Sequence, residues 1–228
     1  YSSAASDVYK RQVCNSAEFI KKAVNNSKEH QNKSPTKERA NYQAWQKPLT
    51  TPGNVKMEVV IKTLSNILPE ETIITNGAGN YNGWLHRYFT YKGWRTQVGS
   101  TSGSMGYGLP AAVAAKLIHH DKEVICLSGD GCFQMTMQEF GTACQYGLNI
   151  ITIISNNSVY GTIKMHQEKA FPGRPSGTSM VNPNFAELAK SYGGHGEVVL
   201  STDQFSGALE RARNSNTVSY THLRAHET

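Results

Sequence analysis

The chain has 228 residues, a hydrophobic content of 38% and a formal net charge of +6, a size that suits one sizeable domain rather than two or three. No apolar run approaches the length of a membrane span, and the lysines and arginines are scattered without interleaved aromatic residues, so we expect no membrane and no nucleic acid among the partners. The four cysteines form no Cys-x-x-Cys pair, which favours reduced thiols and a cytoplasmic protein over a disulfide framework or a zinc site.

The two ends of the chain carry none of the periodicity of a folded domain. Residues 1–12 and residues 218–228 resemble translated sequencing adapters, and we expect both segments to lie outside the fold. We therefore assign no function to His222 and His226. A native disordered tail is the alternative interpretation of these segments.

Residues 13–50 are polar and are typical of the end of a preceding domain followed by a linker. Short helices are expected over 14–24 and 34–46. A cluster of proline, threonine and glycine at 48–53 closes the linker, and the main domain is expected over 51–217.

The first part of the main domain alternates helices and strands. Apolar residues at helical spacing predict a helix over 55–68, and a short strand follows at 72–75. The segment 76–81 carries a Gly-x-Gly turn, which leads into a helix that ends near Phe89. The next strand is expected over 94–98.

Small residues dominate the segment 99–112, which is rich in glycine, serine and alanine. Such a segment allows a flat ligand to approach the backbone closely. The helix expected over 109–118 carries alanines that permit tight packing on a sheet.

The central unit of the domain is a strand, a glycine-rich turn, a helix and a second strand. Apolar runs at 123–127 and 149–154 predict buried strands, and residues 133–146 have helical spacing between them. Asp130 follows the first strand and Asn157 follows the second. Because the carboxyl ends of parallel strands meet at one edge of a sheet, we expect these two side chains to be neighbours.

The chemistry of this edge suits a cation that bridges to a diphosphate. Gly129 and Gly131 let the backbone turn tightly and bring its N–H groups close to an anion. One carboxylate and one amide oxygen, from Asp130 and Asn157, are ligands that Mg²⁺ accepts beside phosphate oxygens and water.

The remaining elements continue the alternation. We expect a helix from Tyr160, a loop over 171–178, a helix over 184–192 capped by Asn182 or Asn184, a strand over 197–200 and a helix over 203–213. Strands and helices that alternate in this way predict an α/β fold, a three-layer doubly wound parallel sheet covered on both faces.

The Gly-Asp-Gly at 129–131 and the Asn-Asn at 156–157, with Asp130 and Asn157 27 positions apart, resemble the diphosphate-binding motif of thiamine diphosphate enzymes. The resemblance implies that Mg²⁺ is bound by the Asp130 and Asn157 side chains and by the main-chain carbonyl of Val159. It also implies cofactor contacts for Gly129, Gly131, Cys132 and Gly161.

The segment Gly103-Ser104-Met105-Gly106-Tyr107-Gly108-Leu109-Pro110-Ala111-Ala112 resembles one found in the acetolactate synthase and pyruvate oxidase group. By this match the Gly103 carbonyl accepts a hydrogen bond from the cofactor's 4′-amino group, Ser104 lies beside it, and Met105 is the wedge that bends the cofactor. Asn80 stands where the family often has a side chain that touches the diphosphate.

Downstream of the metal motif the sequence departs from acetolactate synthases. Gly161 is kept, but Thr162, Ile163 and His166 replace the family's Met, Val and Trp in the substrate pocket. A different thiamine diphosphate lyase or decarboxylase is therefore an alternative. A dinucleotide-binding or a non-catalytic module is a further one, although the Gly-x-Gly at 77–79 puts its third glycine one place late for a dinucleotide site.

The resemblance implies a decarboxylase or carboligase of a small 2-keto acid, a transferase or lyase that uses thiamine diphosphate and Mg²⁺. The activating Glu belongs to a pyrimidine-binding domain that is missing here, so the fragment is expected to have no catalytic residue of its own and to be inactive alone.

The intact enzyme is expected to be a homodimer or homotetramer with upstream domains, with FAD possible in the middle domain. The family fold adds one more strand after residue 213, so the domain is expected to be truncated at its C-terminus.

Overall fold

The structure is a computed structural model that describes residues 15–26 and 36–224. The chain divides into two units, residues 1–44 and 45–228. In the first region two helices are described, α2 (Ser16–Asn26) and α3 (Thr36–Trp45), and neither has a buried residue. They agree with the helices expected over 14–24 and 34–46. The expectation for residues 1–12 lies outside the described residues.

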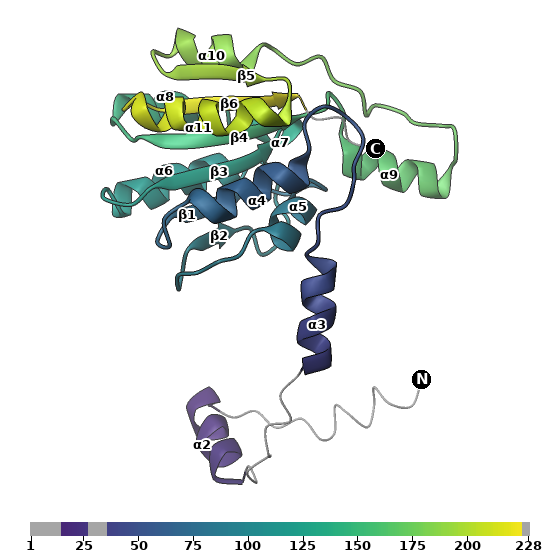
Figure 1. Cartoon of the computed structure of the whole chain (residues 1–228), viewed down its shortest axis with the longest axis vertical. Coiled ribbons are helices and arrows are strands. Elements are labelled where there is room, and N and C mark those ends of the chain that lie inside the picture. Colours follow the sequence, from purple (N-terminus) through teal and green to yellow (C-terminus); the bar gives the residue numbers. More distant parts are fainter. Residues whose placement is uncertain (1–14, 27–35, 225–228) are drawn as a thin grey trace. The chain divides into compact units, whose positions relative to one another are not determined.

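The larger unit is built on one parallel sheet with the strand order β2-β1-β3-β4-β6-β5 (Figure 1). Its strands are β1 (Ile73–Asn76), β2 (Gln97–Gly99), β3 (Val124–Gly129), β4 (Ile150–Asn156), β5 (His195–Val199) and β6 (Ser219–Arg224). Every pair of neighbours is parallel. The predicted α/β fold with a parallel sheet is confirmed.

Helices cover both faces of this sheet (Figure 1). One face packs against α4 (Met57–Ile67), α5 (Asn82–Tyr88) and α11 (Phe205–Asn214), which follows the short 3₁₀ helix η1 (Thr202–Gln204). The other face packs against α6 (Gly108–Ile118), α7 (Asp130–Gln134), α8 (Glu139–Gln145) and α10 (Phe185–Ser191). β3 and β4 are buried along their whole length, as their continuous apolar sequence indicated.

The helix predicted over 133–146 is two helices in the structure, α7 and α8. Thr136 lies in the break between them, and its hydroxyl donates to the Gly106 carbonyl at 2.8 Å. This long-range hydrogen bond bends the chain at a residue where the sequence shows only continuous helical spacing.

The prediction that the fold ends at residue 217 is corrected by β6. This strand pairs with β4 on one side, with Ile151 opposite Ser219, and with β5 on the other, with His195 opposite Ser219. Residues 218–223 are all buried. That residues 218–228 derive from an adapter stays a prediction. A longer sequencing read of the same locus tests it.

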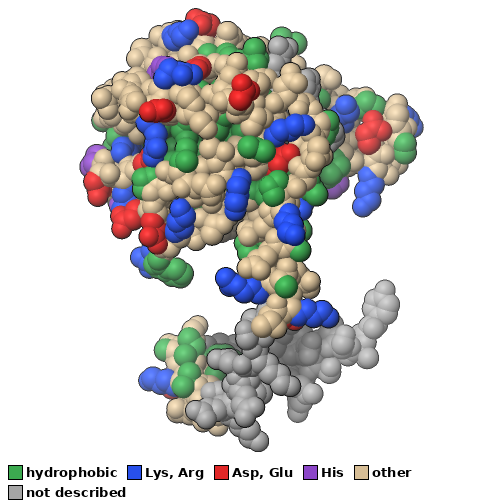
Figure 2. Space-filling view, in the orientation of Figure 1, with side chains coloured by type: hydrophobic (Ala, Val, Ile, Leu, Met, Phe, Trp, Pro, Cys, Tyr) green, Lys and Arg blue, Asp and Glu red, His purple; other side chains and the backbone are tan. Residues whose placement is uncertain are grey.

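Charged side chains on the larger unit are mixed in sign. On the face drawn in Figure 2, basic and acidic residues are interspersed and do not form a single basic stripe. Among the helices described for 15–26 and 36–224, none is long and apolar enough to cross a membrane.

Candidate functional site

A cleft lies at the carboxyl ends of β1, β3 and β4, and its volume is about 420 Å³ with its open mouth included. It gathers most of the residues that the sequence singled out. The predicted site residues that line it are Asn80, Met105, Gly129, Asp130, Gly131, Cys132, Asn157, Val159, Gly161, Thr162 and Ile163. Topology explains the gathering, because parallel strands end together at this edge of the sheet.

Asp130 is a buried side chain of the cleft, held by several hydrogen bonds. It is the first residue of α7, directly after β3, and is only 4% exposed. Its Oδ1 accepts the Gly131 N–H at 2.8 Å. Its Oδ2 accepts the backbone N–H of Ser158 at 2.7 Å and that of Asn157 at 3.2 Å. The carboxylate is therefore tied to both strand ends and has little rotational freedom.

The loop after β4 folds back on itself. Asn157 Oδ1 accepts the Val159 N–H at 3.1 Å, and the Val159 carbonyl accepts the Gly161 N–H at 2.9 Å. Ser158 between them has a φ of 59°, in the left-handed region that residues with a side chain rarely adopt. Such strain at a ligand-binding loop persists only where neighbouring contacts over-determine it.

A second segment pairs with this loop. Tyr160 N–H donates to the Thr178 carbonyl and Met180 N–H donates to the Ser158 carbonyl, both at 2.8 Å. Val159 and Ser179 form an isolated antiparallel bridge. The segment 178–182, called the strap below, thus holds the loop against the sheet edge. The sequence indicated only an irregular loop here.

Close backbone approach at the cleft floor requires glycine. A Cβ at Gly77 would lie 2.3 Å from Cys132 Sγ, and one at Gly129 would lie 2.9 Å from the Tyr81 ring. Cys132 Sγ also accepts the Gly106 N–H at 3.0 Å, while the Tyr81 hydroxyl donates to it at 3.4 Å. Burial, together with the nearby Cys132, raises the pKa of the Tyr81 hydroxyl, so that this group stays a donor. The turns that contain Gly77 and Gly106 therefore both contact the thiol of Cys132, which itself follows the glycine turn at 129–131.

Asn80 and Thr162 face each other across the cleft. The Thr162 hydroxyl donates to Asn80 Oδ1 at 2.9 Å and accepts the Asn80 N–H at 3.1 Å. Thr162 lies in the first turn of α9 (Gly161–Ala170), and Asn80 lies in the turn between β1 and α5. A residue predicted to touch the cofactor and one predicted to touch the substrate are thus direct partners.

Three predicted residues lie away from the cleft. Gly103 and Ser104 are exposed in the turn before α6, where the Ser104 N–H donates to the Ser100 hydroxyl at 2.9 Å. His166 is exposed on α9. Met105, by contrast, is half-buried, lines the cleft and packs against the core.

Asn182 is a polar residue at the site, and the sequence did not assign it there. The helix cap that it was considered for is supplied by Asn184, whose side chain accepts the N–H groups of Ala186 and Glu187. Asn182 instead donates to the Asp130 carboxylate at 2.7 Å. An Asn-Pro pair before a helix is an ordinary cap signal, so no sequence pattern pointed to this contact.

The family model described as "Thiamine pyrophosphate enzyme, C-terminal TPP binding domain" matches residues 77–223. The chain belongs to this family. The match includes the whole glycine-rich cleft and continues into β6, which the sequence had excluded from the fold. It favours a thiamine diphosphate site over the dinucleotide-binding alternative.

Curated relatives agree with the family. The chain is 36% identical over 176 residues to the acetolactate synthase large subunit of Buchnera aphidicola subsp. Schlechtendalia chinensis, which covers 74% of this chain and 30% of that protein. It is 32% identical over 168 residues to the acetolactate synthase isozyme 2 large subunit of Escherichia coli K12, with 72% and 31% covered. The chain thus spans about a third of the length of these relatives.

Among solved structures, the fold matches the thiamine diphosphate-dependent 4-hydroxybenzoylformate decarboxylase of Rhodococcus jostii RHA1. The TM-score is 0.74 at 24% identity, over 80% of this chain and 34% of that chain. This likeness supports the fold. The predicted resemblance to an acetolactate synthase-like domain is confirmed by the family and the relatives together.

Proposed function

We propose that the cleft binds thiamine diphosphate through Mg²⁺, as part of a decarboxylase or carboligase of 2-keto acids that resembles acetolactate synthase. One observation carries the proposal. Asp130, Asn157 and Val159 line a single cleft at the ends of β3 and β4. The family match identifies the cofactor class, and the metal and its ligands are our proposal.

The donor set suits Mg²⁺. Carboxylate, amide and carbonyl oxygens are the hard ligands that this ion prefers. Asp130 Oδ1, Asn157 Oδ1 and the Val159 carbonyl oxygen each accept one hydrogen bond from a backbone N–H, which leaves each of them a further lone pair. Within the described ranges no cluster of three or more His, Cys, Asp and Glu could hold a metal, and the proposed set contains only one such residue.

We propose that the diphosphate is held by the glycine turns that form the cleft floor. Gly129 is the last residue of β3, Gly131 and Cys132 follow it in α7, and Gly161 is the first residue of α9. Asn80 can donate a hydrogen bond from its side-chain amide to the same diphosphate. For the ring end of the cofactor the proposed contacts are Gly103, Ser104 and Met105, of which only Met105 lines the cleft.

When bound, the cofactor supplies the electron sink that lets a 2-keto acid lose CO₂. The residues of this chain bind and orient it, and we assign no catalytic residue to them. We propose that the activating Glu comes from another domain and that this chain is inactive alone. Thr162, Ile163 and His166 are proposed for the substrate side, although His166 is exposed on α9 outside the cleft lining. The homo-oligomer, the possible FAD and the cytoplasmic location stay predictions about the whole enzyme.

Titration calorimetry of the purified chain with thiamine diphosphate, with and without Mg²⁺, tests the proposal. We expect binding that requires Mg²⁺ and that Asp130→Asn reduces at least tenfold, because the amide lacks the anionic oxygen. The matched control is Asp121→Asn, an exposed residue before β3, which should bind as the wild type does. Binding that is indifferent to Mg²⁺ and to Asp130→Asn would contradict the proposal.

A further inference from the structure

We propose that Asn182 is a positioning residue that holds the Asp130 carboxylate in the orientation that metal binding requires, and that Gln134 sets the direction of the Asn182 amide. The inference rests on the proposed function of the cleft. Asn182 is not among the residues that line the cleft, so it acts on the site only through Asp130 and its neighbours.

The Asn182 amide group uses both of its N–H bonds at the site. Its Nδ2 donates to Asp130 Oδ2 at 2.7 Å and to Asn156 Oδ1 at 2.7 Å. Asp130 lies at the end of β3, and Asn156 is the last residue of β4. One amide therefore joins the carboxyl ends of the two strands that are proposed to supply the metal ligands.

The direction of the Asn182 amide is fixed from its other side. Gln134, the last residue of α7, donates from Nε2 to Asn182 Oδ1 at 2.7 Å. With Oδ1 engaged by this donor, Nδ2 faces the two acceptors. A flipped amide would present its oxygen to the Asp130 carboxylate, which has no hydrogen to donate when ionised.

The two oxygens of Asp130 are consequently unequal. Oδ2 accepts three N–H groups, from Asn157, Ser158 and Asn182. Oδ1 accepts, from the part of the chain that the structure describes, only the N–H of Gly131. Oδ2 is therefore the oxygen that fixes the side chain, and Oδ1 is the one with capacity left for a cation. Hydrogen bonds that orient a ligating group in this way typically change metal affinity by about 10- to 100-fold when they are removed.

The strap keeps Asn182 within reach. The Met180 N–H bonds the Ser158 carbonyl at 2.8 Å, two residues before Asn182. The same segment then continues through Asn184, which caps α10. Two asparagines two positions apart thus serve different tasks, since one contacts the Asp130 carboxylate and the other the start of a helix. This provides a matched pair of variants.

The experiment measures the affinity of Mn²⁺, in the presence of thiamine diphosphate, by electron paramagnetic resonance, and the Tm without metal, for Asn182→Ala and Asn184→Ala. We expect Asn182→Ala to weaken Mn²⁺ binding about tenfold or more. Asn184→Ala should lower the Tm by a few degrees through loss of the cap and leave the Mn²⁺ affinity unchanged. Equal affinity in Asn182→Ala and the wild type, or equal losses in both variants, would overturn the inference.

Gln134→Met provides a second variant, should Asn182→Ala fail to fold. It removes the donor that orients the amide while keeping the side-chain length, and we expect a measurable loss of Mn²⁺ affinity that is smaller than the loss of about tenfold expected for Asn182→Ala. An unchanged affinity would count against the role of Gln134. If the wild-type chain binds no Mn²⁺ with the cofactor present, the proposed function fails along with the inference, whereas binding that survives Asn182→Ala removes the inference alone.

Discussion

The backbone N–H of Ser158 donates a hydrogen bond to the Asp130 carboxylate over 2.7 Å, and this contact joins the loop after β4 to the turn after β3. The carboxylate is thus held by the same loop that carries the other proposed metal ligands, Asn157 and Val159. Geometry at one strand end therefore depends on the backbone conformation at the other.

The left-handed conformation of Ser158 should be needed for this contact. Ser158→Val places a β-branched residue at a φ of 59°, which we expect to cost about 1–3 kcal/mol and to weaken Mg²⁺-dependent cofactor binding. Ser158→Gly is the control, because glycine adopts this φ freely and should keep the cofactor affinity. Thermal unfolding and calorimetry measure the two effects. Equal behaviour of the valine and glycine variants would contradict the prediction.

The absence of a side chain at Gly131 should be essential for the cleft. An added Cβ would lie 2.6 Å from the Tyr160 ring, so Gly131→Ala should destabilise the protein by about 1–3 kcal/mol and displace a wall of the cleft. The control is Gly83→Ala in α5, where a Cβ meets no atom of the described residues within 4 Å. There we expect a gain of about 0.5–1 kcal/mol, since alanine favours the helix. Chemical denaturation of both variants provides the comparison, and a stable Gly131→Ala that binds the cofactor would refute the steric argument.

Two buried threonines should respond oppositely to the same substitution. Thr221 of β6 is fully buried, and its hydroxyl has no hydrogen-bond partner among the described residues, whereas the hydroxyl of equally buried Thr75 donates to the Gly108 carbonyl at 2.8 Å. Thr221→Val should therefore stabilise the fold by about 1 kcal/mol, because it removes an unsatisfied polar group. Thr75→Val should destabilise it by about 1–2 kcal/mol, because the carbonyl loses its partner. Free energies of unfolding in urea decide the matter, and a loss of stability in Thr221→Val would show that its hydroxyl is satisfied in solution.

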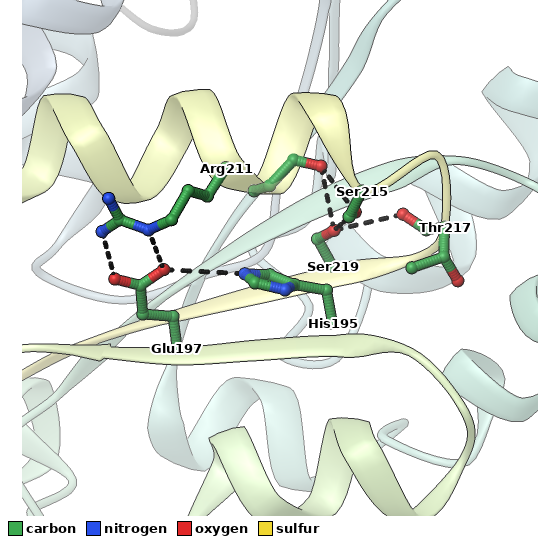
Figure 3. A network of polar contacts seen from close by, with 7 residues as sticks. His195, Glu197, Arg211, Ser215, Thr217 and Ser219 are labelled. Carbon is green, nitrogen blue, oxygen red and sulfur yellow. Dashed lines mark hydrogen bonds and ion pairs between the residues drawn. The ribbon is translucent and has the colours of Figure 1, made fainter.

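The ion pair between Glu197 of β5 and Arg211 of α11 should give stability that depends on pH (Figure 3). The hydrogen bond from Arg211 lowers the pKa of the Glu197 carboxyl, and the nearby His195 adds to this effect. A carboxyl with a lowered pKa in the folded state stabilises the protein above its unfolded pKa of about 4.3, and this contribution disappears as the pH falls through the folded value.

We therefore expect Glu197→Gln to lower the Tm by about 1–3 °C at pH 7, since the pair is partly exposed. The difference from the wild type should shrink as the pH falls below about 4.3 and vanish once the pH has passed through the lowered pKa of Glu197. The control is Glu187→Gln, a carboxylate whose ion pair with Lys190 is more exposed, at 62% for the Glu187 side chain. A difference that persists unchanged at low pH would exclude the ion pair as its source.

The sequence predicted the centre of the fold well because that centre is locally encoded. The strands expected over 123–127 and 149–154 are observed as Val124–Gly129 and Ile150–Asn156. Their continuous apolar runs leave few alternatives to a buried parallel strand. The gathering of Asp130 and Asn157 at one edge then follows from topology alone.

Features that depend on long-range contacts could not be predicted. The break between α7 and α8 accompanies the bond from Thr136 to Gly106, 30 positions earlier in the chain. The contact of Asn182 with Asp130 joins residues 52 positions apart. β6 was excluded because residues 218–228 resemble a translated sequencing adapter and lack the periodicity of a folded domain, although residues 219–224 form an interior strand. In each case the local pattern indicated something else.

The place of β6 in the sheet has a consequence for how the chain folds. Although β6 is the last strand in the described sequence, it lies between β4 and β5, so β5 has no hydrogen-bonded neighbour in the sheet until residues 219–224 have been synthesised. Until β6 has been synthesised, one side of β4 has no strand paired with it. Another nascent chain could add a strand at this open edge. The strand that closes the sheet is therefore synthesised after both of its neighbours, and we expect its docking to be a slow step of folding.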